Sequence, residues 1–82
     1  MQIQKQLREF ITTNYYVPSD TDLDEVESFL ARGILDSTGV LELVTFVESS
    51  FGVSVRDEEL VPANFDSLEA LAAFVERKVK ST

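Results

Sequence analysis

The residues best placed to support chemistry are Asp36 and Ser37, which stand just before an apolar, periodic segment that ends at Gly52. Asp is a favoured helix N-cap and Gly is common just past a helix end, so the pattern predicts a helix over residues 37–51. A serine in the first turn of a helix lies beside backbone N–H groups without an intrahelical partner and at the positive end of the helix dipole. These conditions favour a phosphate attached to the Ser37 hydroxyl.

The rest of the chain offers little that would make Ser37 a catalyst. Its 82 residues include no Cys and no His, which excludes disulfides, thiol nucleophiles, imidazole bases and the usual zinc ligands. A chain this short also has little material for both a core and a substrate cavity. We therefore expect a single domain over residues 1–82 that is not an enzyme and holds no metal, with Ser37 either modified or acting only as a helix cap.

The distribution of charge along the chain indicates which classes of partner the protein can bind. The net charge is −8, and all but one of the 15 acidic residues lie between Glu9 and Glu69, where Arg32 and Arg56 are the only basic ones. An acidic surface repels nucleic acid and anionic membranes and attracts basic proteins. No window reaches the ~18 apolar residues of a membrane span. The first eight residues alternate polar and apolar types, unlike an export signal, so we expect a cytoplasmic protein.

Apolar spacing predicts the first helix and the connection that follows it. A helix over residues 2–14 is indicated by apolar residues at i, i+4, i+7 and i+8, and it ends before Pro18. A long loop over 18–36 should be held by two apolar pairs, Phe29 with Leu30 and Ile34 with Leu35. Whether residues 24–31 are helical is left open. The apolar residues of the first helix are Ile3, Leu7, Phe10 and Ile11.

The helix over residues 37–51 is predicted to have an inner and an outer face. Phe46 falls between the two faces and is not assigned. The inner residues are Val40, Leu43, Val44, Val47 and Phe51, and the outer residues are Thr38, Leu41, Glu42, Thr45, Glu48 and Ser49.

The last third of the chain predicts one short and one long helix. Residues 57–60 suffice for a single helical turn or short helix before Pro62. Asp66 followed by Glu69 is a capping pattern, with Asp66 as the N-cap of a helix that runs to Lys80. The sequence thus predicts an all-α bundle of three main helices and one short helix. The core stripe of the last helix is Leu68, Leu71, Ala72 and Val75.

The segment Gly33-Ile34-Leu35-Asp36-Ser37, followed by Gly39-Val40-Leu41-Glu42-Leu43-Val44 and by Phe51-Gly52, resembles the 4'-phosphopantetheine attachment motif of the acyl carrier protein family. The order of the elements agrees over nearly the whole chain. It includes a Ser-Phe-Leu run in the long loop and Asn64-Phe-Asp-Ser-Leu68 before the last helix.

This resemblance implies that a phosphopantetheinyl transferase moves 4'-phosphopantetheine from coenzyme A to Ser37, and that the arm's thiol carries an acyl group as a thioester, as in fatty acid or polyketide biosynthesis. It also implies a monomer served by an acyl- or aminoacyl-loading ligase and by later enzymes with basic docking patches. The implied partner-binding residues are Asp36, Thr38, Leu41, Glu42, Thr45 and Glu48, and the implied acyl pocket is lined by Val40, Val44, Leu60 and Phe65.

Some features depart from carriers of fatty acid synthesis, which usually have leucine and methionine where Thr38 and Thr45 stand. Together with Gly39, they favour a dedicated pathway, so an aminoacyl or peptidyl carrier is an alternative. The alternative from another class is an unmodified acidic helical module that binds a basic partner. The literal Asp-Ser-Leu string at Asp66 is assigned to capping, which leaves Ser37, and not Ser67, as the modified serine.

Overall fold

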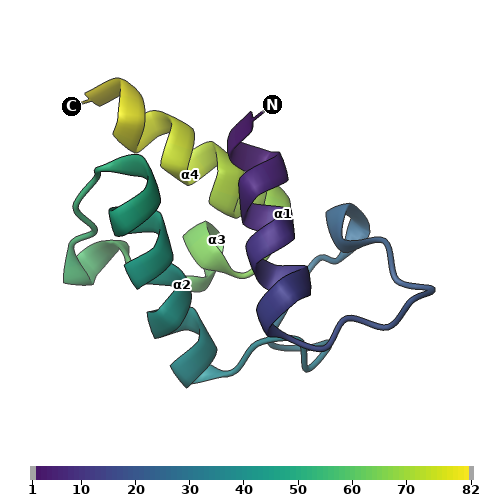
Figure 1. The fold of residues 1–82 in the computed structure, drawn as a ribbon. Helices are drawn as coiled ribbons and strands as arrows, with labels where there is room; N and C mark the ends of the chain where they lie inside the picture. Colours follow the sequence, from purple (N-terminus) through teal and green to yellow (C-terminus); the bar gives the residue numbers. More distant parts are fainter. Residues whose placement is uncertain (1, 82) are drawn as a thin grey trace.

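The computed structural model describes residues 2–81 as a helical bundle, so Met1 and Thr82 of the expected 1–82 unit lie outside the described part. Four α-helices and two short 3-10 turns follow one another without a strand in this range. The molecule measures 37 × 25 × 19 Å. The predicted all-α class is confirmed, and Figure 1 shows α1, α2 and α4 arranged around the short α3.

Helix α1 spans Gln2–Asn14, as the apolar spacing predicts. Leu7 and Ile11 are fully buried, while Ile3 and Phe10 are partly buried against the same core. The helix ends where the Asn14 side chain donates to the Phe10 carbonyl oxygen at 2.8 Å. One face of α1 therefore supplies core contacts along the whole helix.

The long connection from residue 15 to residue 36 is held by buried side chains, but not quite by the pairs expected. Phe29, Ile34 and Leu35 are buried, whereas Leu30 is 45% exposed, so its assignment as a pin is wrong. Two further apolar residues, Leu23 and Val26, take up that role. Residues 24–31, whose conformation the sequence leaves open, form no α-helix. The 3-10 turn η1 covers Leu23–Glu25, and hydrogen-bonded turns follow it.

Acidic residues of this connection have structural roles. Asp22 accepts from the Asp24 backbone N–H at 3.0 Å and so caps η1. Asp24 accepts from Arg8 at 2.8 Å and from Gln4 at 3.1 Å, which ties η1 to α1. These hydrogen bonds, that from Arg8 above all, lower the pKa of Asp24 below its usual value.

Helix α2 spans Ser37–Phe51 with both predicted caps in place. Asp36 is the N-cap, and Gly52 ends the helix in the left-handed region at φ +67°, where glycine avoids the strain of a side chain. Leu43 and Val47 are fully buried, and the other inner residues Val40, Val44 and Phe51 are partly buried against the core. The unassigned Phe46 faces α1, where its ring stacks on Phe10 at a centroid distance of 4.2 Å.

Two short elements, not one, follow α2. The 3-10 turn η2 covers Asp57–Glu59, and helix α3 covers Pro62–Phe65. The predicted turn before Pro62 is present, but Pro62 also begins a helix that the prediction omitted. Proline suits the first helical position because its fixed φ is helical and no N–H is needed there. This second short helix places Phe65 in the core and leaves Val61 at the surface.

Helix α4 spans Leu68–Ser81, and its cap differs from the expectation. The predicted N-cap, Asp66, does not cap α4, because its carboxylate accepts hydrogen bonds from the 28–30 segment. Ser67 caps the helix by accepting from the Ala70 backbone N–H at 3.1 Å. The cap of α4 is thus Ser67, one residue after the predicted Asp66.

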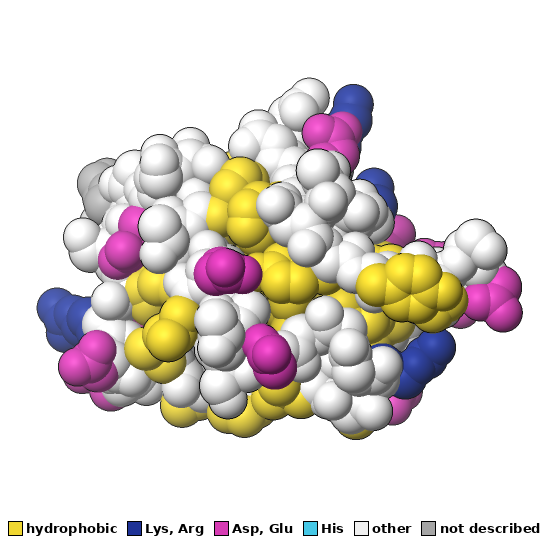
Figure 2. All heavy atoms as spheres, turned by 60° about the horizontal axis from the view of Figure 1, so that its bottom comes forward, with side chains coloured by type: hydrophobic (Ala, Val, Ile, Leu, Met, Phe, Trp, Pro, Cys, Tyr) yellow, Lys and Arg dark blue, Asp and Glu magenta, His cyan; other side chains and the backbone are white. Residues whose placement is uncertain are grey.

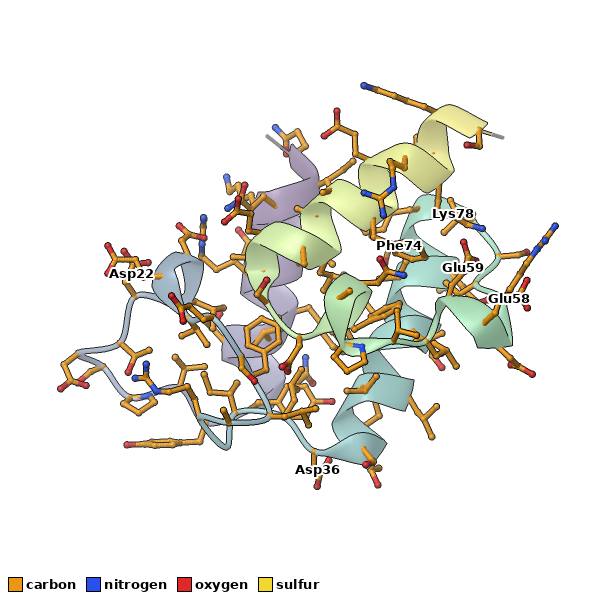
Figure 3. All side chains as sticks on the ribbon, turned by 180° about the vertical axis from the view of Figure 1, so that it is seen from behind. Asp22, Asp36, Glu58, Glu59, Phe74 and Lys78 are labelled. Atoms are coloured by element: carbon orange, nitrogen blue, oxygen red, sulfur yellow. The ribbon has the colours of Figure 1, made fainter. Side chains whose placement is uncertain are left out.

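Helix α4 is the element on which the others pack. It contacts α1, α2, α3 and η1, and its predicted stripe of Leu68, Leu71, Ala72 and Val75 is buried, together with Phe74. Far from the start of α2, the Lys78 ammonium lies 2.9 Å from the Glu59 carboxylate and joins α4 to η2, as Figure 3 shows. The fully buried side chains are Phe29, Leu7, Ile11, Leu43, Leu68, Leu71, Val47 and Val75.

Candidate functional site

Ser37 is the first residue of α2 and is exposed. Its neighbour Asp36 turns its carboxylate onto the helix, accepting from the Gly39 N–H at 2.8 Å. Within residues 2–81 the Ser37 hydroxyl has no hydrogen-bond partner, and neither do the backbone N–H groups of Ser37 and Thr38. Ser37 thus carries a free hydroxyl at the positive end of a helix dipole.

An apolar pocket of about 200 Å³ opens beside Ser37. Val40, Leu60 and Phe65 were expected in such a pocket and line it; Val44, expected with them, does not. Asp66 is the one charged residue of its wall. Besides the residues already named, the lining is formed by Leu30, Ser37, Val61 and Pro62.

A second, more polar hollow also borders Ser37. It is lined by residues of the 15–36 connection and measures about 460 Å³. Leu30 and Ser37 belong to both hollows, so Leu30 stands between them. Figure 2, which brings this end of the molecule forward, shows hydrophobic side chains reaching the surface between acidic ones. The lining of the second hollow is Tyr15, Leu30, Gly33, Ile34, Leu35, Asp36 and Ser37.

The expected partner face on α2 is exposed, except for one residue. Asp36, Thr38, Glu42 and Thr45 are exposed, and Leu41 is 59% exposed. Glu48 is only partly exposed, because its carboxylate accepts from the Val55 backbone N–H at 2.9 Å. Glu42 accepts from the Tyr15 hydroxyl. The carboxylates of Glu42 and Glu48 therefore also stabilise the fold, which periodicity along one helix does not reveal.

Tyr15 is the contact that joins the end of α1 to the first turn of α2. Besides its hydrogen bond to Glu42, its ring lies beside Gly39: a Cβ there would be 3.4 Å from the Tyr15 ring and crowded at 3.1 Å by Leu35. Burial, followed by the bond to Glu42, raises the pKa of Tyr15 to about 12. Gly39 thus lets the connection approach the helix that carries Ser37.

Asp66, Leu30, Val61 and Pro62 are the residues of this region that the sequence reasoning missed. Asp66 was assigned to a cap, and Leu30 to the core. Asp66 stands out in the sequence as the first residue of the Asp-Ser-Leu string, but its partners Ser28 and Leu30 are 36 or more residues away along the chain. No local pattern reports such a contact.

These observations define a class of protein: a small all-helical bundle with a free serine hydroxyl at the start of its second long helix, beside an apolar pocket. The chain is 28% identical over 75 residues to the "Probable acyl carrier protein PigG" of Serratia sp. (strain ATCC 39006). That similarity covers 92% of this chain and 86% of the Serratia protein. The chain is therefore acyl-carrier-protein-like in sequence and in fold. A comparison with models of known protein families found no match.

No helix within residues 2–81 has both the length and the apolar character that crossing a membrane requires.

Proposed function

We propose that the chain is a non-enzymatic carrier of acyl groups, loaded with 4'-phosphopantetheine at Ser37. The observation that carries the proposal is the free Ser37 hydroxyl at the N-terminus of α2, beside an apolar pocket. The similarity to a probable acyl carrier protein supports the same reading. The terminal thiol of the arm would supply the sulfur for a thioester, since the chain itself contains no Cys.

The residues around Ser37 fit an attached phosphodiester. The backbone N–H groups of Ser37 and Thr38 are available to it, and the helix dipole favours its negative charge. The Asp36 carboxylate would oppose that charge, but its Oδ1 is held by the Gly39 N–H. With Ser37 exposed, a transferase can reach its hydroxyl without unfolding α2.

The apolar pocket supports a role in sheltering the carried group. Its volume of about 200 Å³ lies below the ~300–1,000 Å³ of typical small-molecule sites, so it would take a small acyl group or part of a longer one. Val40, Leu60 and Phe65 would contact that group. An aminoacyl or peptidyl carrier is the nearest alternative, because Gly39 stands two residues after Ser37.

We further propose that partner enzymes dock on the outer face of α2. This role is assigned to Asp36, Thr38, Leu41, Glu42, Thr45 and Glu48. The partners would be a phosphopantetheinyl transferase, a loading ligase and acyl-processing enzymes with basic patches. The acidic charge of the face supports attraction to such patches.

Incubation with coenzyme A and a promiscuous phosphopantetheinyl transferase, followed by intact-mass measurement, tests the attachment. The chain should gain the mass of one phosphopantetheine, and Ser37→Ala should abolish the gain. Ser67→Ala is the matched control: it removes the α4 cap at a cost of about 1 kcal/mol but should leave loading intact. If the folded wild-type chain gains no mass, the carrier proposal fails; loading that depends on Ser67 would mean that Ser37 is the wrong serine.

A further inference from the structure

Asp66 joins two parts of the apolar pocket's lining, the residues around α3 and Leu30 of the long connection. It follows Phe65 at the end of α3, and its carboxylate accepts from the Ser28 hydroxyl and, at 3.0 Å, from the Leu30 backbone N–H. Its own carbonyl oxygen accepts from the Phe29 N–H at 2.7 Å. Three consecutive residues of the long connection, Ser28, Phe29 and Leu30, thus donate hydrogen bonds to Asp66.

The anchored turn determines where Leu30 lies. Ser28 braces the turn from within by accepting from the Ala31 N–H at 3.1 Å. Phe29 is fully buried and points into the core, so the next residue, Leu30, faces outward and stays 45% exposed. An apolar side chain outside the buried core is therefore held in place by the polar contacts of its backbone.

Leu30 separates the two hollows that flank Ser37. With Leu30 in place, a group that enters the apolar side has about 200 Å³ available. If the turn moved outward, that pocket would open into the larger hollow of about 460 Å³. The position of Leu30 therefore sets the space next to Ser37.

We infer that Asp66 is a positioning residue that holds Leu30 as the wall of the pocket and thereby limits the size of the carried acyl group that is sheltered. This inference rests on the proposed function for its effect on acyl groups. Its structural part concerns the unmodified chain and can be tested without loading. Asp66 acts through Leu30, because its carboxylate is committed to Ser28 and the Leu30 N–H.

The first measurement is amide hydrogen exchange in the unmodified protein. In Asp66→Ala the Leu30 amide should exchange at least about tenfold faster than in the wild type, since a hydrogen bond to a charged acceptor is lost. Amides of the α1 and α4 cores should change much less. Asp66→Asn, which retains one acceptor oxygen, should lie between the two. Asp20→Ala is the matched control, because Asp20 is exposed and, within residues 2–81, its side chain forms no hydrogen bond or ion pair.

The second measurement uses chains loaded with a four-carbon or an eight-carbon acyl group. Hydrolysis adds water across the thioester: the C–S bond breaks, and a carboxylic acid and the free thiol form. The wild type should slow this reaction more for the short group than for the long one, relative to the same thioesters on free pantetheine. Asp66→Ala should bring the ratio of the two rates at least about threefold closer to that of free pantetheine, and Asp20→Ala should not.

The outcomes separate the inference from the proposed function. A chain that cannot be loaded removes the carrier proposal but leaves the exchange measurement in force. Wild-type exchange at Leu30 in Asp66→Ala would overturn the inference, as would an unchanged ratio of hydrolysis rates. If Asp66→Ala does not fold, Asp66→Asn and Ser28→Ala make the same test, with smaller expected changes in the same direction.

Discussion

At the scale of single residues, the site depends on side chains that hold Ser37 in place without being modified themselves. Asp36 caps α2, Gly39 leaves room for the 15–36 connection, and Tyr15 donates a hydrogen bond to Glu42, 27 residues later in the chain. Of these three residues, Tyr15 contributes through a proton that it can lose, that of its hydroxyl group. Its raised pKa shows that the folded state favours the protonated phenol, which donates to Glu42.

Tyr15→Phe keeps the ring but removes this hydrogen bond, and we expect a loss of about 1 kcal/mol in the free energy of unfolding at pH 7. Because the folded pKa is raised from 10.0 to about 12, the wild-type contribution is complete below pH 10 and is lost as the pH rises toward 12. Urea denaturation at several pH values should therefore show the two proteins converging at alkaline pH.

Tyr16→Phe is the matched control, since Tyr16 is 82% exposed. Its free energy of unfolding should stay within about 0.5 kcal/mol of the wild type. Equal losses in the two variants would contradict the role of the Tyr15 hydroxyl, and so would a difference between Tyr15→Phe and the wild type that does not shrink with rising pH.

At the scale of elements, α2 serves two purposes with its two faces. Leu43 and Val47 join it to the core, and the outer face presents Leu41 and the carboxylates of Glu42 and Glu48. These carboxylates also hold Tyr15 and Val55. A change on the outer face can thus alter docking and stability together, and an experiment must separate the two effects.

Reversing the charge at both Glu42 and Glu48 to Lys should slow loading by the transferase about tenfold at low salt. The effect should shrink as salt is raised, because screening weakens attraction to a basic patch. Asp57→Lys with Glu58→Lys makes the same total charge change on η2 and is the control. Circular dichroism checks that both double variants are folded. Equal slowing in the two would assign the effect to net charge and not to α2.

At the scale of the whole molecule, acidic charge is in excess. The net charge is −8, and the ion pairs of Arg8 with Asp24 and of Lys80 with Glu76 lie at the surface, while that of Lys78 with Glu59 is partly buried. Surface pairs contribute little, whereas a large net charge of one sign destabilises a compact state by self-repulsion. Repulsion should therefore outweigh these attractions.

Raising NaCl from about 0.02 to about 0.3 M should raise the midpoint temperature of thermal unfolding by a few degrees. The two concentrations lie below and above about 0.1 M, where the screening length is ~10 Å. For a domain of this size about 1 kcal/mol corresponds to about 4–8 °C. The control replaces Glu9, Asp20 and Glu25 by their amides; these residues are exposed, and the change should reduce the response to salt. A midpoint that falls with added salt would show that the ion pairs dominate.

Features that depend on near neighbours in the chain follow from the amino-acid sequence alone. Helices 2–14 and 37–51 follow from apolar spacing, and the caps at Asp36 and Gly52 follow from the conformations that these residue types favour. These signals lie within a few residues of the structure that they specify, so the position of Ser37 at a helix start could be read directly.

Which distant residues meet depends on the packing of the helices in three dimensions. It placed Phe46 against Phe10, exposed Leu30, and turned Asp66 from the expected α4 cap to the 28–30 segment. The physical reason is that a carboxylate near a helix start can serve either the local N–H groups or a distant donor. The choice depends on packing around α4, which brings residues 36 and more positions apart into hydrogen-bond distance.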